Sequence, residues 1–155
     1  MVKILKVIAV VLVLAFIALQ FYRPEMTNPP IVEAETIAAS AQIPENVQTL
    51  LKRSCNDCHS NETVYPWYSN VSPFSWKLAE HIEEGRRELN LSVWNTYSGK
   101  KKRSKLDEIC EQATTGEMPH NQYLWIHAEA RLSEEDKKLL CDWAETEKAK
   151  IPESQ

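Results

Sequence analysis

The stretch Cys55-Asn56-Asp57-Cys58-His59 places two thiols three residues apart and an imidazole directly after the second thiol. The chain has 4 Cys and 4 His in 155 residues, so about 0.003 matches to this pattern are expected by chance. The pattern is that of c-type haem attachment. The two thiols add across two vinyl groups of one porphyrin edge, and the adjacent His binds the iron as proximal ligand. We therefore expect one covalently attached haem c, with Cys55, Cys58 and His59 as its binding residues.

Two other interpretations of the cysteine pair are open from the residues alone. A CxxC pair also occurs in thioredoxin-like redox proteins, but no βαβ pattern surrounds this one. It could form half of a zinc site, but a second closely spaced Cys/His pair is missing, because Cys110 and Cys141 stand alone in the sequence.

The N-terminal segment is apolar without a polar break from residue 7 to residue 19. Counted from Ile4 to Tyr22, it is close to the ~20 residues that cross a bilayer. Lys3 and Lys6 precede it, which predicts a cytoplasmic N-terminus. A cleaved signal peptide is the alternative to an uncleaved anchor. The bulky residues 20–24 contain no small-x-small cleavage site and favour the anchor. Either way, the domain is exported, and we expect it in the periplasm, tethered to a bacterial inner membrane.

These features divide the chain into an anchor or signal segment (1–22), a linker (23–43) and a haem-binding c-type cytochrome domain (44–150). Hydrophobic residues spaced three and four apart predict helices in the domain, and no period-two pattern predicts a strand. Gly116 is expected to end one helix, Ser133 to cap the last, and Ser72-Pro73 to open another. We expect an all-α, cytochrome c-like fold of four or five short helices around one haem, preceded by a transmembrane helix.

The sixth iron ligand has one leading candidate, Met118. It lies just after the predicted helix end and before Pro119, whose fixed φ and missing N–H favour a rigid loop. Met/His ligation is typical of haem electron carriers and raises the reduction potential. The alternatives are a gap-filling core role for Met118 and ligation by His81, with His120 and His127 as further candidates.

Two further pairs of residues, one aromatic and one of cysteines, have predicted roles. Trp67 and Tyr68 follow the motif closely, and we expect them to contact the haem ring. Cys110 and Cys141 lie on the predicted inner faces of two helices. In an exported chain they could form a disulfide, and two buried free thiols are the alternative.

Several stretches resemble the bacterial haem-binding-domain family of small exported c-type cytochromes. They are CNDCHSNETVYPWYSN (55–70), HIEEGR (81–86), LNLSVW (89–94), EMP (117–119) followed by Tyr123 and His127, and QFYRP (20–24). The resemblance covers most of the chain and implies an all-α haem domain. In that family, positions 110 and 141 are usually not cysteine.

The function predicted is single-electron transfer at the periplasmic face, with redox proteins as partners. The chain shows no Ser/His/Asp or paired-carboxylate arrangement, so we do not expect an enzyme. The net charge of −4 gives no sign of a nucleic-acid partner. The alternative is a haem-based sensor or ligand-binding module with a displaceable sixth ligand. The basic run 100–105 is either a solvated turn or a docking site for an acidic partner or anionic headgroups.

Overall fold

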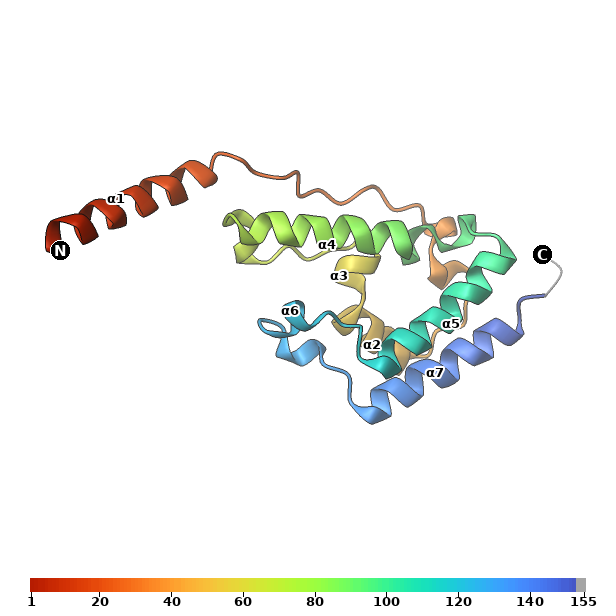
Figure 1. The fold of residues 1–155 in the computed structure, drawn as a ribbon. Helices are drawn as coiled ribbons and strands as arrows, with labels where there is room; N and C mark the ends of the chain where they lie inside the picture. The colour runs from red at the N-terminus through yellow and green to blue at the C-terminus, as the bar shows by residue number, and fades with distance from the viewer. Residues whose placement is uncertain (153–155) are drawn as a thin grey trace.

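The computed structural model describes residues 1–152, and within them every regular element is a helix (Figure 1). The all-α prediction is confirmed. The α-helices are α1 (Val2–Leu19), α2 (Glu45–Ser54), α3 (Asn56–His59), α4 (Phe74–Glu88), α5 (Gly99–Thr115), α6 (Asn121–Leu124) and α7 (Glu134–Ala149). The 3-10 helices are η1 (Glu33–Glu35), η2 (Ile37–Ala39), η3 (Trp67–Asn70), η4 (Leu91–Thr96) and η5 (Ala128–Ala130). Beyond α1, the described part has four helices of ten residues or more and two single turns, α3 and α6.

The ends of the helices follow local chemistry closely. Gly116 ends α5 in the left-handed conformation at φ 78°, as expected. Ser133 caps α7 in a capping box, in which its hydroxyl accepts from the backbone N–H of Asp136 and the Asp136 carboxylate accepts from the backbone N–H of Ser133. The predicted start of α4 is shifted by one residue. Pro73 is its N-cap, and the Ser72 hydroxyl instead lies 3.2 Å from the hydroxyl of Ser75.

The core forms where α5 and α7 pack side by side in opposite directions and α2 packs on α7 (Figure 1). Buried side chains of η4 join this core. Its buried hydrophobic residues are Ile37, Val47, Leu50, Leu51, Leu91, Trp94, Leu106, Ala113, Leu140, Trp143 and Ala144. A disulfide between Cys110 and Cys141 joins α5 to α7, with Cα atoms 4.8 Å apart. It decides between the two alternatives for these cysteines in favour of the cross-link, which fixes the helix pair behind the Met118 loop.

The segment that we predicted as a linker packs along the domain from Thr27 onward. The Thr27 carbonyl accepts from the Tyr65 hydroxyl at 3.0 Å, and Asn28 donates to the Thr63 carbonyl at 3.0 Å. Further on, Asn95 donates to the carbonyls of Ala34 and Thr36, and Ile37 is buried in the core. Most of these contacts use backbone groups, which leave no hydrophobic period in the sequence.

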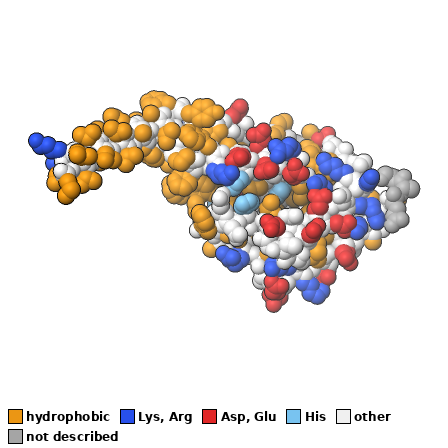
Figure 2. Space-filling model, viewed as in Figure 1, with side chains coloured by type: hydrophobic (Ala, Val, Ile, Leu, Met, Phe, Trp, Pro, Cys, Tyr) orange, Lys and Arg blue, Asp and Glu red, His pale blue; other side chains and the backbone are white. Residues whose placement is uncertain are grey.

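The first helix stands apart from the rest of the molecule. None of the residues of α1 is buried, and α1 projects from the domain as a continuous hydrophobic rod (Figures 1 and 2). By length and composition it can cross a membrane. This finding fits an anchor and a signal sequence equally.

Candidate functional site

The single turn α3 gathers the three residues of the Cys-x-x-Cys-His motif on one face. The backbone N–H groups of Cys58 and His59 both donate to the Cys55 carbonyl, at 3.2 and 2.9 Å. Residues three and four apart on a helical turn are neighbours. The turn therefore holds both thiols and the imidazole toward the same side.

The ring of His59 is fixed by backbone carbonyls. Its Nδ1 lies 3.0 Å from the carbonyl oxygens of both Gly85 and Leu89. Carbonyl oxygens only accept, so Nδ1 carries the proton and donates, and Nε2 is left with its lone pair. Burial lowers the pKa of His59 against the opposing effect of these two hydrogen bonds. The result is a neutral, oriented imidazole of the kind that binds iron or zinc.

Close contact between α3 and α4 depends on Gly85. A Cβ added to Gly85 would lie 2.6 Å from the carbonyl oxygen of Cys58 and 3.1 Å from its Cβ. Only glycine lets the two backbones approach this closely, and that approach brings the Gly85 carbonyl to His59. The role of Gly85 is not visible in the sequence, because a helical glycine has no local signal for close approach.

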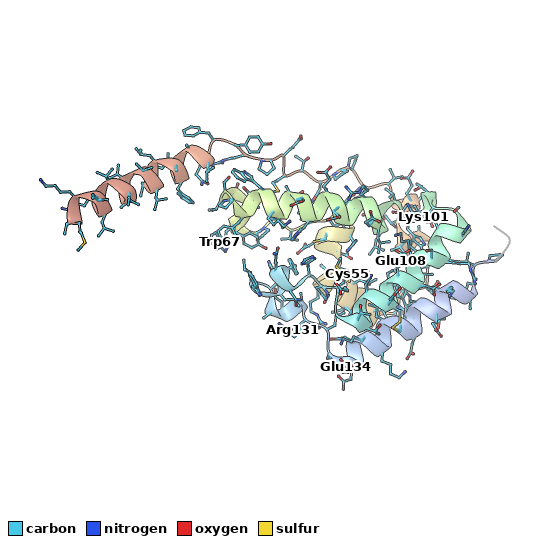
Figure 3. All side chains as sticks on the ribbon, viewed as in Figure 1. Cys55, Trp67, Lys101, Glu108, Arg131 and Glu134 are labelled. Atoms are coloured by element: carbon cyan, nitrogen blue, oxygen red, sulfur yellow. A yellow bond between two sulfur atoms is a disulfide. The ribbon has the colours of Figure 1, made fainter. Side chains whose placement is uncertain are left out.

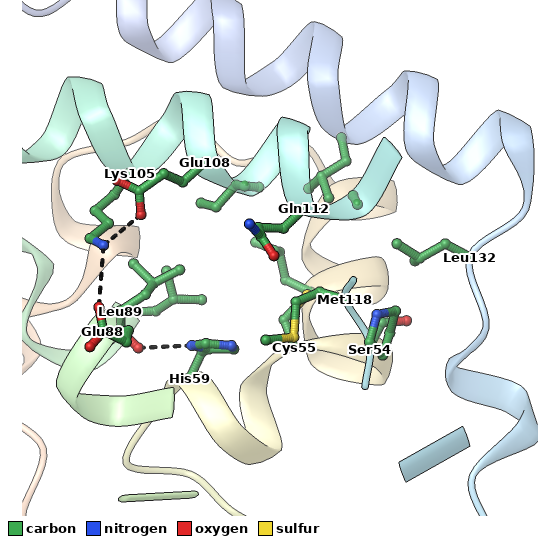
Figure 4. A pocket seen from close by; sticks show the side chains of 16 residues that line it. Ser54, Cys55, His59, Glu88, Leu89, Lys105, Glu108, Gln112, Met118 and Leu132 are labelled. Carbon is green, nitrogen blue, oxygen red and sulfur yellow. Dashed lines mark hydrogen bonds and ion pairs between the residues drawn. The ribbon is translucent and has the colours of Figure 1, made fainter. Parts of the chain in front are cut away.

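The motif faces two adjoining cavities of about 290 and 560 Å³. Both volumes are near or within the range of pockets that hold small molecules and cofactors. Six residues line both cavities: Ser54, Cys55, His59, Glu88, Met118 and Pro119. The larger cavity also contains Cys58. Figure 4 shows His59, Cys55 and Met118 converging on the smaller one, with the second ring nitrogen of His59 directed into it.

Met118 is presented by the loop that follows α5. Its backbone N–H donates to the Gln112 carbonyl at 3.1 Å, and 39% of the residue is exposed. Two other candidate ligands, His81 and His120, line the larger cavity and stack on each other with ring centroids 4.9 Å apart. His127 is engaged elsewhere, since its ring bonds the Tyr68 hydroxyl at 2.8 Å and Glu129 at 3.1 Å.

The two aromatic residues after the motif, Trp67 and Tyr68, differ in burial. Tyr68 is buried and lines the larger cavity. Trp67 is 74% exposed and lines neither cavity, although its ring meets that of Tyr68 edge-on at 5.9 Å. The structure therefore does not bring Trp67 to the site. Neighbouring residues in the 3-10 turn η3 point in different directions, so only one of them faces inward.

The thiols do not resemble a reactive dithiol. Burial raises the pKa of Cys55 to about 12 and that of Cys58 to about 11. Redox-active Cys-x-x-Cys pairs have lowered thiol pKa values instead. Cys110 and Cys141 are bonded to each other, so they are not available as further ligands for a zinc ion.

A network of hydrogen bonds that the sequence did not reveal holds the residues within and after the motif in place. The Asp57 carboxylate accepts from the Tyr123 hydroxyl at 2.8 Å and from the backbone N–H of Val64 at 3.0 Å. Arg86 donates to the Ser60 carbonyl at 2.8 Å and to the Thr63 hydroxyl at 2.9 Å. These contacts join the loop after the motif to α4 and α6.

Residues 14–146 match the family described as the haem-binding domain. The chain belongs to the haem-binding-domain family. Since the match covers α2 to most of α7, this haem-binding domain includes both cavities and the disulfide. In the same comparisons, no curated protein and no solved structure matched the chain.

Proposed function

We propose that this haem-binding domain is a mono-haem c-type cytochrome that transfers single electrons on the periplasmic side of a bacterial inner membrane. One observation carries the proposal. Cys55, Cys58 and an oriented, neutral His59 project from one helical turn toward adjoining cavities that Met118 also lines. Sulfur for attachment and nitrogen for the iron are thus supplied from the same turn.

The residues of the motif would hold haem as a covalent group. Each thiol, of Cys55 and of Cys58, would add across one vinyl group to give a thioether, and Nε2 of His59 would donate its lone pair to the iron. When bound, the haem supplies an iron that gains or loses one electron between Fe(III) and Fe(II). No acid or base residue is needed for this exchange, so we propose no enzymatic activity.

The surrounding side chains would exclude water from the site. Most of the residues that line the smaller cavity are apolar: Leu51, Leu89, Leu91, Ile109, Ala113, Met118, Pro119, Leu132 and Leu140. Three charged residues, Glu88, Lys105 and Glu108, line it as well. In the larger cavity, Tyr68 adds an aromatic ring. An apolar shell of this kind controls solvent access and, with it, the reduction potential of a bound metal centre.

In this proposal, Met118 would bind the iron as its sixth ligand. A displaceable ligand would instead make the domain a haem-based sensor. The observation that favours this second candidate is the partial exposure of Met118, which lines the same cavity as the stacked His81 and His120. The two differ in coordination. A carrier keeps six ligands in both redox states, whereas a sensor opens a position to NO or CO.

Absorption spectra test both candidates. The full chain is produced in a host that attaches haem c, and its oxidised and reduced spectra are recorded with and without CO. A low-spin spectrum that CO does not change supports the carrier. A spectrum that CO shifts, whether low-spin or high-spin before CO is added, supports the sensor. Met118→Ala should lose the low-spin form, while His81→Ala, the matched variant at the competing ligand, should keep it. The opposite pattern would assign the ligand to His81.

A further inference from the structure

Four large hydrophobic side chains are exposed around the larger cavity. Trp67 is 74% exposed, Phe74 60%, Trp125 81% and Ile126 52%. Phe74, Trp125 and Ile126 line this cavity, and Trp67 contacts Tyr68, which also lines it. The four residues come from η3, the start of α4 and the end of α6, so folding assembles them into one surface. We call this set of three aromatic residues and one isoleucine the aromatic rim.

The aromatic rim lies at the end of the domain where α1 leaves it. Gln20, directly after α1, exchanges two hydrogen bonds with the backbone of Ser72, at 2.9 and 3.1 Å. The indole N–H of Trp76 donates to the Tyr22 carbonyl at 2.8 Å, and the two rings meet edge-on at 5.7 Å. These contacts fix the C-terminal end of α1 at the start of α4, beside Phe74.

The figures agree with this placement. Figure 3 shows Trp67 at the end of the domain next to α1, and Lys101 at the opposite end. In Figure 2 the hydrophobic surface of α1 continues onto the adjacent edge of the domain. The basic run, with Lys101 in it, therefore lies far from α1. A headgroup-docking role for this run is not compatible with a bilayer around α1.

The length of α1 sets where a membrane surface would meet the domain. Its 18 residues span about 27 Å at ~1.5 Å per residue, close to the ~30 Å hydrocarbon thickness of a bilayer. Gln20 and Tyr22 would then lie at the headgroup level, and so would the residues bonded to them. Tryptophan and other aromatic side chains are enriched at this level, where an apolar ring and a polar atom are both accommodated.

We propose that the aromatic rim inserts into the interfacial layer of the phospholipid bilayer that α1 spans, so that the larger cavity opens at the membrane surface. The inference rests on the inner-membrane location in the proposed function and adds that α1 is retained there as an uncleaved anchor. It does not require haem attachment. Large hydrophobic side chains that lie at the headgroup level gain free energy by entering the interfacial layer, because their apolar surface then leaves water.

Site-specific photo-crosslinking tests the proposal. The photoreactive residue p-benzoylphenylalanine replaces Trp67 or Trp125, one at a time, in the full chain reconstituted in phosphatidylcholine/phosphatidylglycerol vesicles with a radiolabelled lipid. Lys101→p-benzoylphenylalanine is the control at the opposite end. We expect about tenfold more lipid adduct at positions 67 and 125 than at 101, given the interfacial depth of such side chains.

Each other outcome overturns the proposal. Equal lipid yields at the three positions would show that the rim is in water. Protein–protein adducts at 67 and 125 in place of lipid adducts would identify a second copy as the occupant. An intact mass that lacks the N-terminal segment would show that this segment is cleaved and that the domain has no anchor. The same experiment on Cys58→Ala, where haem attachment is expected to fail, separates the two proposals, because lipid adducts should persist there.

Discussion

Replacing Gly85 with alanine is expected to push α3 away from α4 at the point that orients His59. The new Cβ would lie 2.6 Å from the Cys58 carbonyl oxygen, whereas ordinary van der Waals contact begins near 3.4 Å. The obstacle is backbone rather than the end of a flexible side chain. The two helices must therefore separate by about 0.8 Å, and the Gly85 and Leu89 carbonyls move away from Nδ1 of His59.

The expected cost follows from two opposing terms. Overpacking of a well-packed site costs about 1–3 kcal/mol, and a rigid obstacle places this case at the upper end. Alanine in a helix interior gains about 1 kcal/mol over glycine. We expect the free energy of unfolding to fall by about 1–2 kcal/mol relative to the unchanged chain.

Guanidinium denaturation followed by circular dichroism measures this change, and the reduction potential reports the displacement of His59. Glu83→Ala is the matched control, because Glu83 is exposed on the same helix. It should leave both quantities nearly unchanged. A Gly85→Ala protein as stable as the parent, with an unchanged potential, would refute the close approach of α3 and α4 and the role assigned to Gly85.

Three other predictions concern the disulfide, Met118 and the Arg53–Asp136 ion pair. Replacing both Cys110 and Cys141 with serine opens a loop closed across a sequence separation of 31 residues and should cost about 3.7 kcal/mol in guanidinium denaturation; no loss under non-reducing conditions would mean that the disulfide is absent. Met118→Ala should lower the reduction potential, since a thioether ligand raises it; an unchanged potential in a redox titration would remove Met118 from the iron. Desolvation raises the pKa of Asp136, but hydrogen bonds from Ser133 and Arg53 lower it by more, so the net shift is downward. The stabilisation by ionised Asp136 is therefore fully present when the pH is above the pKa of Asp136 in the unfolded state. It is lost as the pH falls through the pKa of Asp136 in the folded state. Arg53→Ala should cost at most about 1 kcal/mol at pH 7 and nothing near pH 2 in urea denaturation, and an equal cost at both pH values would contradict the ion pair.

Much of the fold was accessible from the sequence because its signals are local. Gly116 and Ser133 set helix ends through their own backbone and side chain, so their roles hold in any tertiary context. The motif at 55–59 likewise requires only one helical turn. Periodicity placed Cys110 and Cys141 on the inner faces of two helices, but the disulfide between them was only one of two alternatives at that point.

The features that were missed depend on contacts between distant segments. The carbonyls of Gly85 and Leu89 orient His59, but every residue has a carbonyl and none marks these two. Trp67 and Tyr68 are equally aromatic and adjacent, and only the path of η3 decides which one is buried. The segment from Thr27 to Ile37 packs through backbone hydrogen bonds that periodicity does not reveal.

The intact mass of the exported chain, measured under denaturing conditions, tests covalent haem attachment most directly. Denaturation releases a haem held only by coordination and keeps one bonded through sulfur. We predict the mass of the polypeptide plus one haem for the unchanged chain, and loss of most of that species for Cys58→Ala. The bare polypeptide mass from a host that attaches haem c, or a full yield of the haem-bearing species from Cys58→Ala, would contradict the proposal.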